Sequence, residues 1–209
     1  MPPGGVHQFG WCVADGTADG IRIRRSGLAS HALGAFTAIV GALQVDEQPA
    51  AAGIDSPLFW VTDGDRAADK CIRRAMKTLG APNVGGTVQQ VNSLRGACLS
   101  QGILVAHLLR QRWPHIRVSE SHPKALLWLL KVATVKRSAI AIKVRDIPGV
   151  GCEPDASCGE HERDAALGAL AANAMLTAQA GWRDLRLQER DAFEPISPVE
   201  YWMPMRVNE

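Results

Sequence analysis

The N-terminal part of the chain alternates between apolar and polar residues in a way that predicts a β-hairpin. In Val6–Ala14, apolar side chains occupy every second position from Phe9 to Val13, and Gly20–Ser26 alternates strictly as well. Side chains of a strand point to opposite faces in turn, so this period of two is typical of half-buried strands. Asp15-Gly16 and a second glycine separate the two runs. Such residues favour a tight turn between paired strands.

The pattern then changes to the period of a helix. Apolar residues from Leu33 to Leu43 recur at helical spacing, which predicts a helix over about Ala32–Leu43 with Ser30 as its N-cap. Ala50–Asp55 follows as a short apolar run without polar alternation. A strand buried on both faces has this pattern. The expected order is therefore strand, strand, helix, strand.

The rest of the chain predicts further helices and one more strand. Pro114 and Pro123 divide the region, and proline suits the first turn of a helix because its missing N–H is not needed there. Residues 138–144 fit a strand or a helix, and residues 149–159 have the Gly, Pro, Asp and Ser content of a loop. The helices are expected over 66–79, 88–112, 123–130 and 162–182, and the strand over 116–121.

These elements indicate one α/β domain over residues 1–190, followed by an extended C-terminal arm over 191–209 that packs on it. A chain of 209 residues fits one domain of ordinary size. Its 46% hydrophobic and 21% charged content is typical of globular proteins. The net charge of only +2 excludes a basic field over the whole protein, so any contact with nucleic acid should be local.

Cysteine usage and the absence of long apolar runs indicate a cytoplasmic protein. The five cysteines lack the paired spacing of zinc ribbons, which favours free thiols over disulfides or a structural zinc site. No apolar run approaches the roughly 18–20 residues of a membrane span. The N-terminus lacks the basic flank and apolar core of a signal peptide. We therefore expect no membrane partner, and the oligomeric state stays open.

Three separated carboxylates are the candidate chemical groups. Asp55 and Glu120 follow predicted strands, where ligands gather in open α/β sheets, and Asp164 lies one turn into the last long helix with His161 on the same face. Mg²⁺ prefers oxygen ligands and is usually held by one or two carboxylates with substrate phosphates. The pattern predicts a site for one or two divalent cations and indicates phosphodiester chemistry.

Each carboxylate also has a purely structural interpretation. Asp55 alone would more often cap a helix or form a turn, and Asp164 suits the first turn of a helix because the dipole favours acidic residues there. Glu120 ends a buried strand and needs a partner. That partner could be an arginine, and the set would then be a structural ion-pair network; the candidates are Arg66, Arg73 and Arg163.

Three basic residues are candidates for binding a substrate phosphate. Arg66, Asp69 and Arg73 share one helix face, which fits either a solvated charge set or arginines that hold phosphate in a bidentate manner. Lys124, just after the Glu120 strand, is a further candidate. His122 is expected to be a turn histidine. The scattered tryptophans are expected in the core or at interfaces and not in a base-stacking platform.

The order and spacing of these motifs resemble one family. The motifs are Ile54–Leu58, Arg66-x-x-Asp69 with Arg73-Arg74, Glu120–Pro123 and His161–Ala165. They resemble DUF429, described as predicted nucleases of the ribonuclease H-like superfamily, over about Val6–Ala178. The resemblance implies a ribonuclease H-like fold with a mixed five-stranded sheet flanked by helices. It also implies a site for Mg²⁺ or Mn²⁺ built from Asp55, Glu120 and Asp164, with His161 beside them.

One position departs from the pattern that the resemblance implies. Families of this fold usually carry an aspartate on the first strand, and here His7 stands about where it belongs. Imidazole is a poorer ligand than carboxylate for Mg²⁺ but acceptable to Mn²⁺ or Zn²⁺. The site is therefore altered, the protein is a non-catalytic relative, or the register of this short strand differs.

The sequence thus supports a leading hypothesis and two alternatives. The first is a metal-dependent nuclease in which a metal-activated water hydrolyses phosphodiester bonds of nucleic acid, with His161 as auxiliary ligand or proton carrier. The second is a non-catalytic binding or scaffold protein that keeps the fold without the first-strand aspartate. A phosphotransferase ranks last, because no Gly-rich phosphate loop follows the first hairpin.

Overall fold

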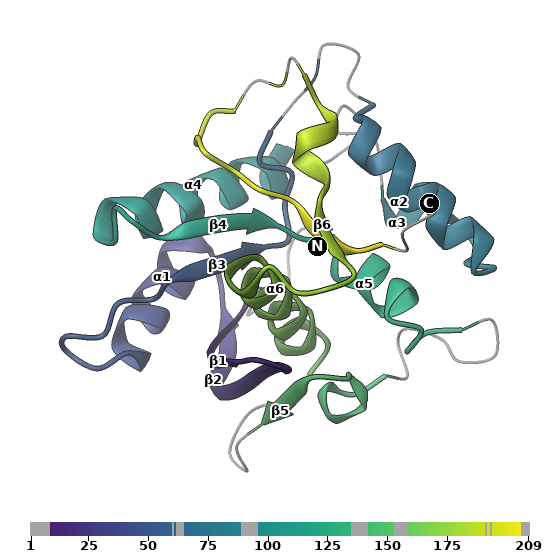
Figure 1. Ribbon diagram of the computed structural model, residues 1–209. Coiled ribbons are helices and arrows are strands. Elements are labelled where there is room, and N and C mark those ends of the chain that lie inside the picture. Colours follow the sequence, from purple (N-terminus) through teal and green to yellow (C-terminus); the bar gives the residue numbers. More distant parts are fainter. Residues whose placement is uncertain are drawn as a thin grey trace.

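The predicted N-terminal hairpin is present in the computed structural model of the protein (Figure 1). The structure describes residues 9–59, 61, 65–88, 96–134, 142–152, 159–190, 192 and 194–205. Strand β1 (Phe9–Thr17) pairs antiparallel with β2 (Gly20–Ala29). The turn lies after Thr17 and not at Asp15-Gly16 as expected. Asn173 explains this position, because its side-chain amide donates to the carbonyls of Thr17 and Gly20 at 3.1 and 2.8 Å.

A short third strand extends this sheet. Strand β5 (Val150–Cys152) pairs parallel with β2, so the strand order is β1-β2-β5. The prediction of a loop over 149–159 is wrong for these first residues, while 153–158 lie outside the described residues. A three-residue strand is too short to show a hydrophobic period. Its position is fixed by pairing, beginning with the bond from Ile21 N–H to Gly149 O at 2.6 Å.

The two predicted central strands are confirmed as a parallel pair. Strand β3 (Ala51–Ile54) and β4 (Arg117–Glu120) are in register, with Ile54 opposite Glu120. A third sheet pairs β6 (Trp182–Asp184) with β7 (Trp202–Pro204) antiparallel. The fold is therefore mixed α/β, as expected. Among the described residues the strands form sheets of three, two and two, so the five-stranded sheet is not confirmed.

Six α-helices lie in the part of the chain that the structure describes. They are α1 (Ala32–Ala42), α2 (Ala67–Thr78), α3 (Val84–Thr87), α4 (Gly96–Arg112), α5 (Pro123–Leu129) and α6 (Glu160–Thr177). Two 3₁₀ helices, η3 (Val144–Asp146) and η4 (Leu185–Gln188), complete the set.

Most of the predicted helix positions agree with the structure, and the differences are local. His31 caps α1 in place of Ser30, because its Nδ1 accepts a bond from the Gly34 N–H at 3.1 Å. Pro123 opens α5 as expected. The helix expected from residue 88 is seen from Gly96, and residues 89–95 lie outside the described residues. Residues 138–141 of the ambiguous segment are outside them too.

Helix α6 lies against both the hairpin and the β3–β4 pair (Figure 1). Its buried face is rich in alanine and leucine, whose small and medium side chains let the sheets approach closely. The closest approach joins backbone to backbone: a Cβ placed on Gly53 would lie 1.8 Å from the carbonyl oxygen of Gly168. No residue with a side chain fits at Gly53 without moving the helix away from β3.

The contacts along α6 show the direction in which each strand crosses it. Gly10, early in β1, lies against the backbone of His161, and Gly16, near its end, lies against Asn173. Strand β1 therefore follows α6 from its N-terminal end to its C-terminal end.

Strands β3 and β4 run the other way. Arg117, at the start of β4, donates to the carbonyl of Met175 at 3.3 Å near the end of α6, whereas Ser121, after β4, lies beside Gly168. The start of β1 and the ends of β3 and β4 therefore all face the N-terminal half of α6.

The C-terminal segment adds to the edge of β4. The N–H of Glu200 donates to Val118 O at 3.0 Å, and the N–H of Glu120 donates to Glu200 O at 2.8 Å. Arg117 also forms an ion pair with Glu200 at 2.7 Å. Tyr201 and Met203 are fully buried. The segment is thus part of the core beside the end of β4.

No helix in the described part of the chain combines the length and the apolar character that crossing a bilayer requires.

The glycine contact predicts a stability difference that a matched control isolates. Gly53→Ala should lower the free energy of unfolding by about 1–3 kcal/mol or more, because the added methyl meets the Gly168 carbonyl. Gly41→Ala, in α1 with no atom within 4 Å of its Cβ position, should instead stabilise by roughly 0.5–1 kcal/mol. Urea unfolding of both variants measures this. Equal midpoints would contradict the close approach of β3 to α6.

Candidate functional site

Glu120, predicted as a metal ligand, lies in a buried ion-pair network with Arg66 and Asp69. The Arg66 guanidinium donates to both Glu120 oxygens, at 2.7 Å from Nη1 and 2.5 Å from Nη2. Its Nε and Nη2 donate to the two Asp69 oxygens at 2.8 and 2.9 Å. All three side chains are 0% exposed. One guanidinium therefore neutralises part of the charge of two carboxylates in the interior.

The remaining contacts of Arg66 are with protein groups too. Its Nη1 donates to the carbonyl of Phe59 at 3.3 Å, and the guanidinium lies 4.3 Å from the centre of the Phe59 ring. Arg66 was predicted to hold a substrate phosphate. The structure places it in the interior, where its donors are engaged by Phe59, Asp69 and Glu120. This is the structural ion-pair network that the sequence left open as an alternative for Glu120.

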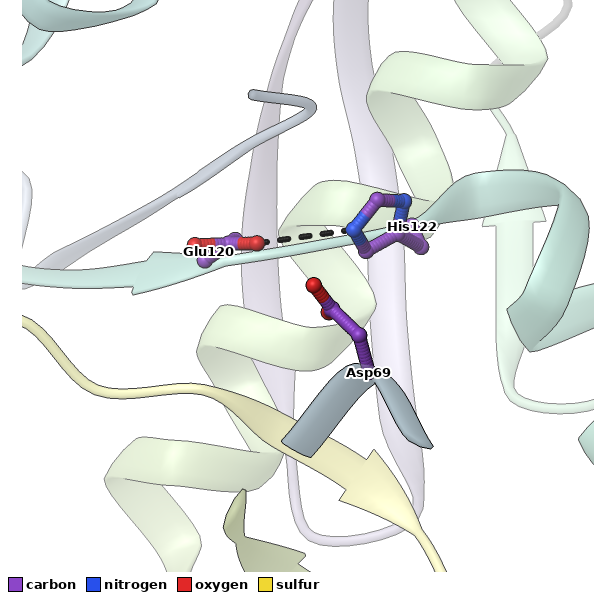
Figure 2. Close-up of side chains that lie close together, drawn as sticks. All are labelled: Asp69, Glu120 and His122. Atoms are coloured by element: carbon purple, nitrogen blue, oxygen red, sulfur yellow. Dashed lines mark ion pairs between the residues drawn. The ribbon is translucent and has the colours of Figure 1, made fainter. Parts of the chain in front are cut away.

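His122 contacts the same Glu120 oxygen, Oε1, that Nη2 of Arg66 bonds. Its Nε2 lies 3.4 Å from Oε1 of Glu120 (Figure 2), and its side chain is only 12% exposed. Burial alone would raise the pKa of Glu120, but Arg66 and His122 outweigh burial and lower the pKa. Burial opposes protonation of His122, yet the adjacent Glu120 carboxylate raises the pKa of His122 overall.

Asp69, Glu120 and His122 form the one group of three His, Cys, Asp or Glu side chains in the described residues whose possible ligand atoms lie within 4.8 Å of one another (Figure 2). Two carboxylates and an imidazole suit a transition metal. However, the Arg66 guanidinium already bonds to both carboxylates, and a metal ion here would have to compete with it. The group therefore already contains a cation supplied by the protein.

Asp55 has a different environment from Glu120. It directly follows β3, and the residue is exposed. Protein around the carboxyl still limits its hydration and raises its pKa to about 6; the charge of His122 opposes this rise, and the charge of Asp164 adds to it. Among the described residues, Asp55 has no ion pair with an arginine of the kind that Glu120 forms with Arg66. Asp55 is thus a carboxylate that ionises reluctantly at an accessible position.

Asp164 lies in the second turn of α6 beside the buried Arg163. Arg163 Nε and Nη2 donate to Oδ1 of Asp164 at 3.1 and 2.7 Å, and the Asp164 side chain is 17% exposed. Burial raises the pKa of Asp164, Arg163 opposes the rise, and the charge of Glu160 adds to it. His161, predicted to assist the site, lies in the first turn of α6 with its backbone against Gly10 of β1.

The geometry of β3 and α6 places Asp55 and Asp164 at the same height along the axis of α6. Gly53 contacts Gly168, and the chain from Gly53 to Asp55 advances about 6.6 Å at a strand's rise per residue. Since β3 and α6 run in opposite directions, the matching helix position lies about four residues before Gly168, at 1.5 Å per residue. That position is Asp164. The charge of Asp164 acts on Asp55 and raises its pKa, which agrees with this placement.

The predicted phosphate ligands lie in different places. Lys124, in the first turn of α5, is half exposed, and its Nζ lies 3.6 Å from Glu160 Oε1. Its charge acts on both Asp55 and Asp164, so it belongs to the same edge. Arg73 is paired with Asp65 at 2.5 Å and is mostly covered.

The sequence did not assign roles to two residues of the buried network. Asp69 could have been recognised, because its i, i+3 spacing from Arg66 on one helix permits an ion pair. Tyr201 could not, since its hydroxyl reaches Asp69 at 3.4 Å from a distant part of the chain. His7 lies outside the described residues, so its expected place on the first strand stays a prediction.

Removal of the buried guanidinium should be severely destabilising. Arg66→Met leaves Asp69 and Glu120 buried without their cation, which should cost about 3–5 kcal/mol of unfolding free energy. Arg74→Met, at an exposed position of the same helix, should change it by less than about 0.5 kcal/mol. Urea denaturation followed by circular dichroism measures both. A similar small effect for the two variants would show that the network contributes little.

The raised pKa of Asp55 predicts how stability depends on pH. The carboxyl ionises near pH 4 in the unfolded chain but at about 6 in the folded protein, so its ionisation favours unfolding between these values. As the pH rises from 4 to 6, the melting temperature of Asp55→Asn should therefore rise relative to that of the native protein. The difference should stay constant above that range. A difference independent of pH would contradict the raised pKa.

Comparison with known proteins gives one match. The family model for DUF429, described as a protein of unknown function, matches residues 7–194 of the 209. Searches of curated proteins and of solved structures gave no match. The match covers the hairpin, the β3–β4 pair, α6 and every candidate residue discussed above. The chain therefore belongs to the DUF429 family.

Proposed function

We propose that this protein is a divalent-metal-dependent nuclease that hydrolyses phosphodiester bonds of nucleic acid. The site lies at the edge formed by the ends of β3 and β4 and the N-terminal half of α6. One observation carries the proposal: Asp55 and Asp164 lie at the same level of this edge, each with a raised pKa, and the basic side chain of Lys124 accompanies them. Carboxylates without a sufficient counter-charge are suited to a bound cation.

The residues at this edge fit the Mg²⁺ or Mn²⁺ expected from the sequence. Asp55 and Asp164 would hold the ion through oxygen, which both metals prefer. Glu120 is left out of this ligand set, because Arg66 already occupies both of its oxygens. A bound divalent cation supplies Lewis-acid polarisation of a phosphate and lowers the pKa of water.

Other side chains at the edge have roles that follow from their charge and position. Lys124 is half exposed and is able to turn from Glu160 towards a substrate phosphate. His161 begins the turn that carries Asp164 and is placed to carry a proton or to assist as a ligand. Because the net charge is only +2, these few groups would make a short, local contact with nucleic acid.

We also propose that the fold is ribonuclease H-like. Three features support this relation: an antiparallel hairpin opens the chain, a parallel strand pair carries acidic residues at its ends, and a long helix with a further carboxylate covers them.

Cleavage assays test the proposal directly. The protein would be incubated with labelled single-stranded, duplex, hybrid and branched nucleic acids in Mn²⁺. We expect metal-dependent cleavage that falls by about 100-fold or more in Asp55→Asn and Asp164→Asn, since even outer-shell changes at metal sites cost 10–100-fold. Asp46→Asn, an exposed carboxylate outside the site, should retain activity.

The outcome of the assay separates the nuclease from its alternative. Cleavage that is undiminished in Asp164→Asn would remove Asp164 from the site. Absence of cleavage of every substrate, together with a rise in melting temperature in Mn²⁺ that Asp55→Asn abolishes, would instead favour the non-catalytic binding protein. A ligand that binds only the folded state must raise the melting temperature, so this second measurement does not depend on finding the substrate.

A further inference from the structure

We propose that Arg163 is a positioning residue for Asp164: it binds one carboxylate oxygen and leaves the other oxygen for the cation. Asp164 then binds the cation through a single oxygen, at a site whose negative charge Arg163 reduces. The inference rests on the proposed function only in placing a cation at the Asp55–Asp164 edge. It deepens that function, because it determines which divalent cation the site prefers and how tightly the site holds it.

Both hydrogen bonds from Arg163 to Asp164 end on the same oxygen. Nε and Nη2 of Arg163 donate to Oδ1 at 3.1 and 2.7 Å. A bidentate pair would use both oxygens, as Arg66 does with Glu120. None of the hydrogen bonds that the Asp164 carboxyl accepts within the described part of the chain reaches Oδ2. This second oxygen is therefore available to a cation.

The guanidinium is itself fixed in the protein. Nη1 of Arg163 donates to the carbonyl of Ile142 at 3.2 Å, and Nη2 lies 3.6 Å from Oε1 of Glu160. The Arg163 side chain is only 2% exposed, whereas that of Asp164 is 17% exposed. Because Arg163 is held from two other directions, it keeps Oδ1 engaged and fixes the orientation of the Asp164 carboxylate.

The charges at the beginning of α6 alternate in sign. Oε1 of Glu160 lies 3.6 Å from Nζ of Lys124 as well as 3.6 Å from Arg163, which in turn bonds to Asp164. Together with Asp55, the edge carries three carboxylates against two cationic side chains. A divalent cation would more than balance this charge, and an added phosphate would restore the balance. Mg²⁺ is usually held in this way, by one or two carboxylates together with substrate phosphates.

A single oxygen from Asp164 also favours small cations over Ca²⁺. Ca²⁺ takes roughly six to eight oxygen ligands and accepts carboxylates through one or both oxygens, whereas Mg²⁺ keeps several waters and needs fewer protein ligands. Since Arg163 occupies Oδ1, Asp164 offers Ca²⁺ one oxygen in place of two. Arg163→Met should therefore gain more affinity for Ca²⁺ than for Mn²⁺.

Calorimetry and cleavage assays of Arg163→Met test the proposal. Loss of a positive charge beside the cation should tighten Mn²⁺ binding by about 10-fold, because Arg163 repels the ion across a few ångströms. Cleavage should nevertheless fall by about 10-fold or more, because Asp164 loses the group that orients it. A residue that only stabilised the fold would not move affinity and cleavage in opposite directions.

Arg117→Met is the matched control. Arg117 also bonds to α6, through the carbonyl of Met175, and pairs with a carboxylate, that of Glu200, but it lies at the opposite end of the helix. Its replacement should leave the affinity for Mn²⁺ and the rate of cleavage unchanged.

Each contrary result has a distinct meaning. Mn²⁺ binding that is unchanged or weaker in Arg163→Met, and abolished in Asp164→Asn, would overturn the role of Arg163 and leave the proposed function standing. Absence of Mn²⁺ binding by the native protein would overturn both proposals. Where Arg163→Met fails to fold, a crystal structure of the native protein with Mn²⁺ decides. An ion on Oδ2 with Arg163 still on Oδ1 supports the proposal, and an ion on both oxygens overturns it.

Discussion

The ion pairs of Arg66 with Asp69 and Glu120 are the interaction on which the arrangement of the site depends. A single buried guanidinium joins α2 to the end of β4, and through Phe59 and Tyr201 it also fixes the loop after β3 and the C-terminal segment. Buried ion pairs often add little net stability, because desolvation offsets the attraction. Removal of one partner is nevertheless costly, so the network specifies how these elements meet.

This network divides the acidic residues into two groups with different chemistry. Glu120 and Asp69 share the buried Arg66 cation, whereas Asp55 and Asp164 have raised pKa values at an edge that solvent reaches. Carboxylates with raised pKa values resist ionisation in the folded protein, and such perturbed groups are frequent at functional sites. His122 contacts Glu120 at 3.4 Å, and its charge acts on Asp55.

The sequence predicted those elements whose periodicity is local. The hairpin, β3, β4 and α6 were expected from their apolar patterns and α5 from Pro123. Glu120 was predicted as a metal ligand, with an ion pair to an arginine as the structural alternative. What the sequence could not show depends on contacts between distant segments. The strand β5 is defined only by its pairing with β2, and the partner of Glu120 became clear only once α2 was placed. Asp55 and Asp164 lie at the same height along α6 because Gly53 contacts Gly168, and no local sequence pattern indicates that contact.

The central claim is that the cation site lies at the Asp55–Asp164 edge and not inside the buried network. Anomalous diffraction from crystals soaked in Mn²⁺, recorded near the manganese absorption edge, locates the ion directly. The account predicts a peak bounded by the carboxylates of Asp55 and Asp164, with Arg66 still bonded to Glu120. A peak among Asp69, Glu120 and His122 with Arg66 displaced would contradict it.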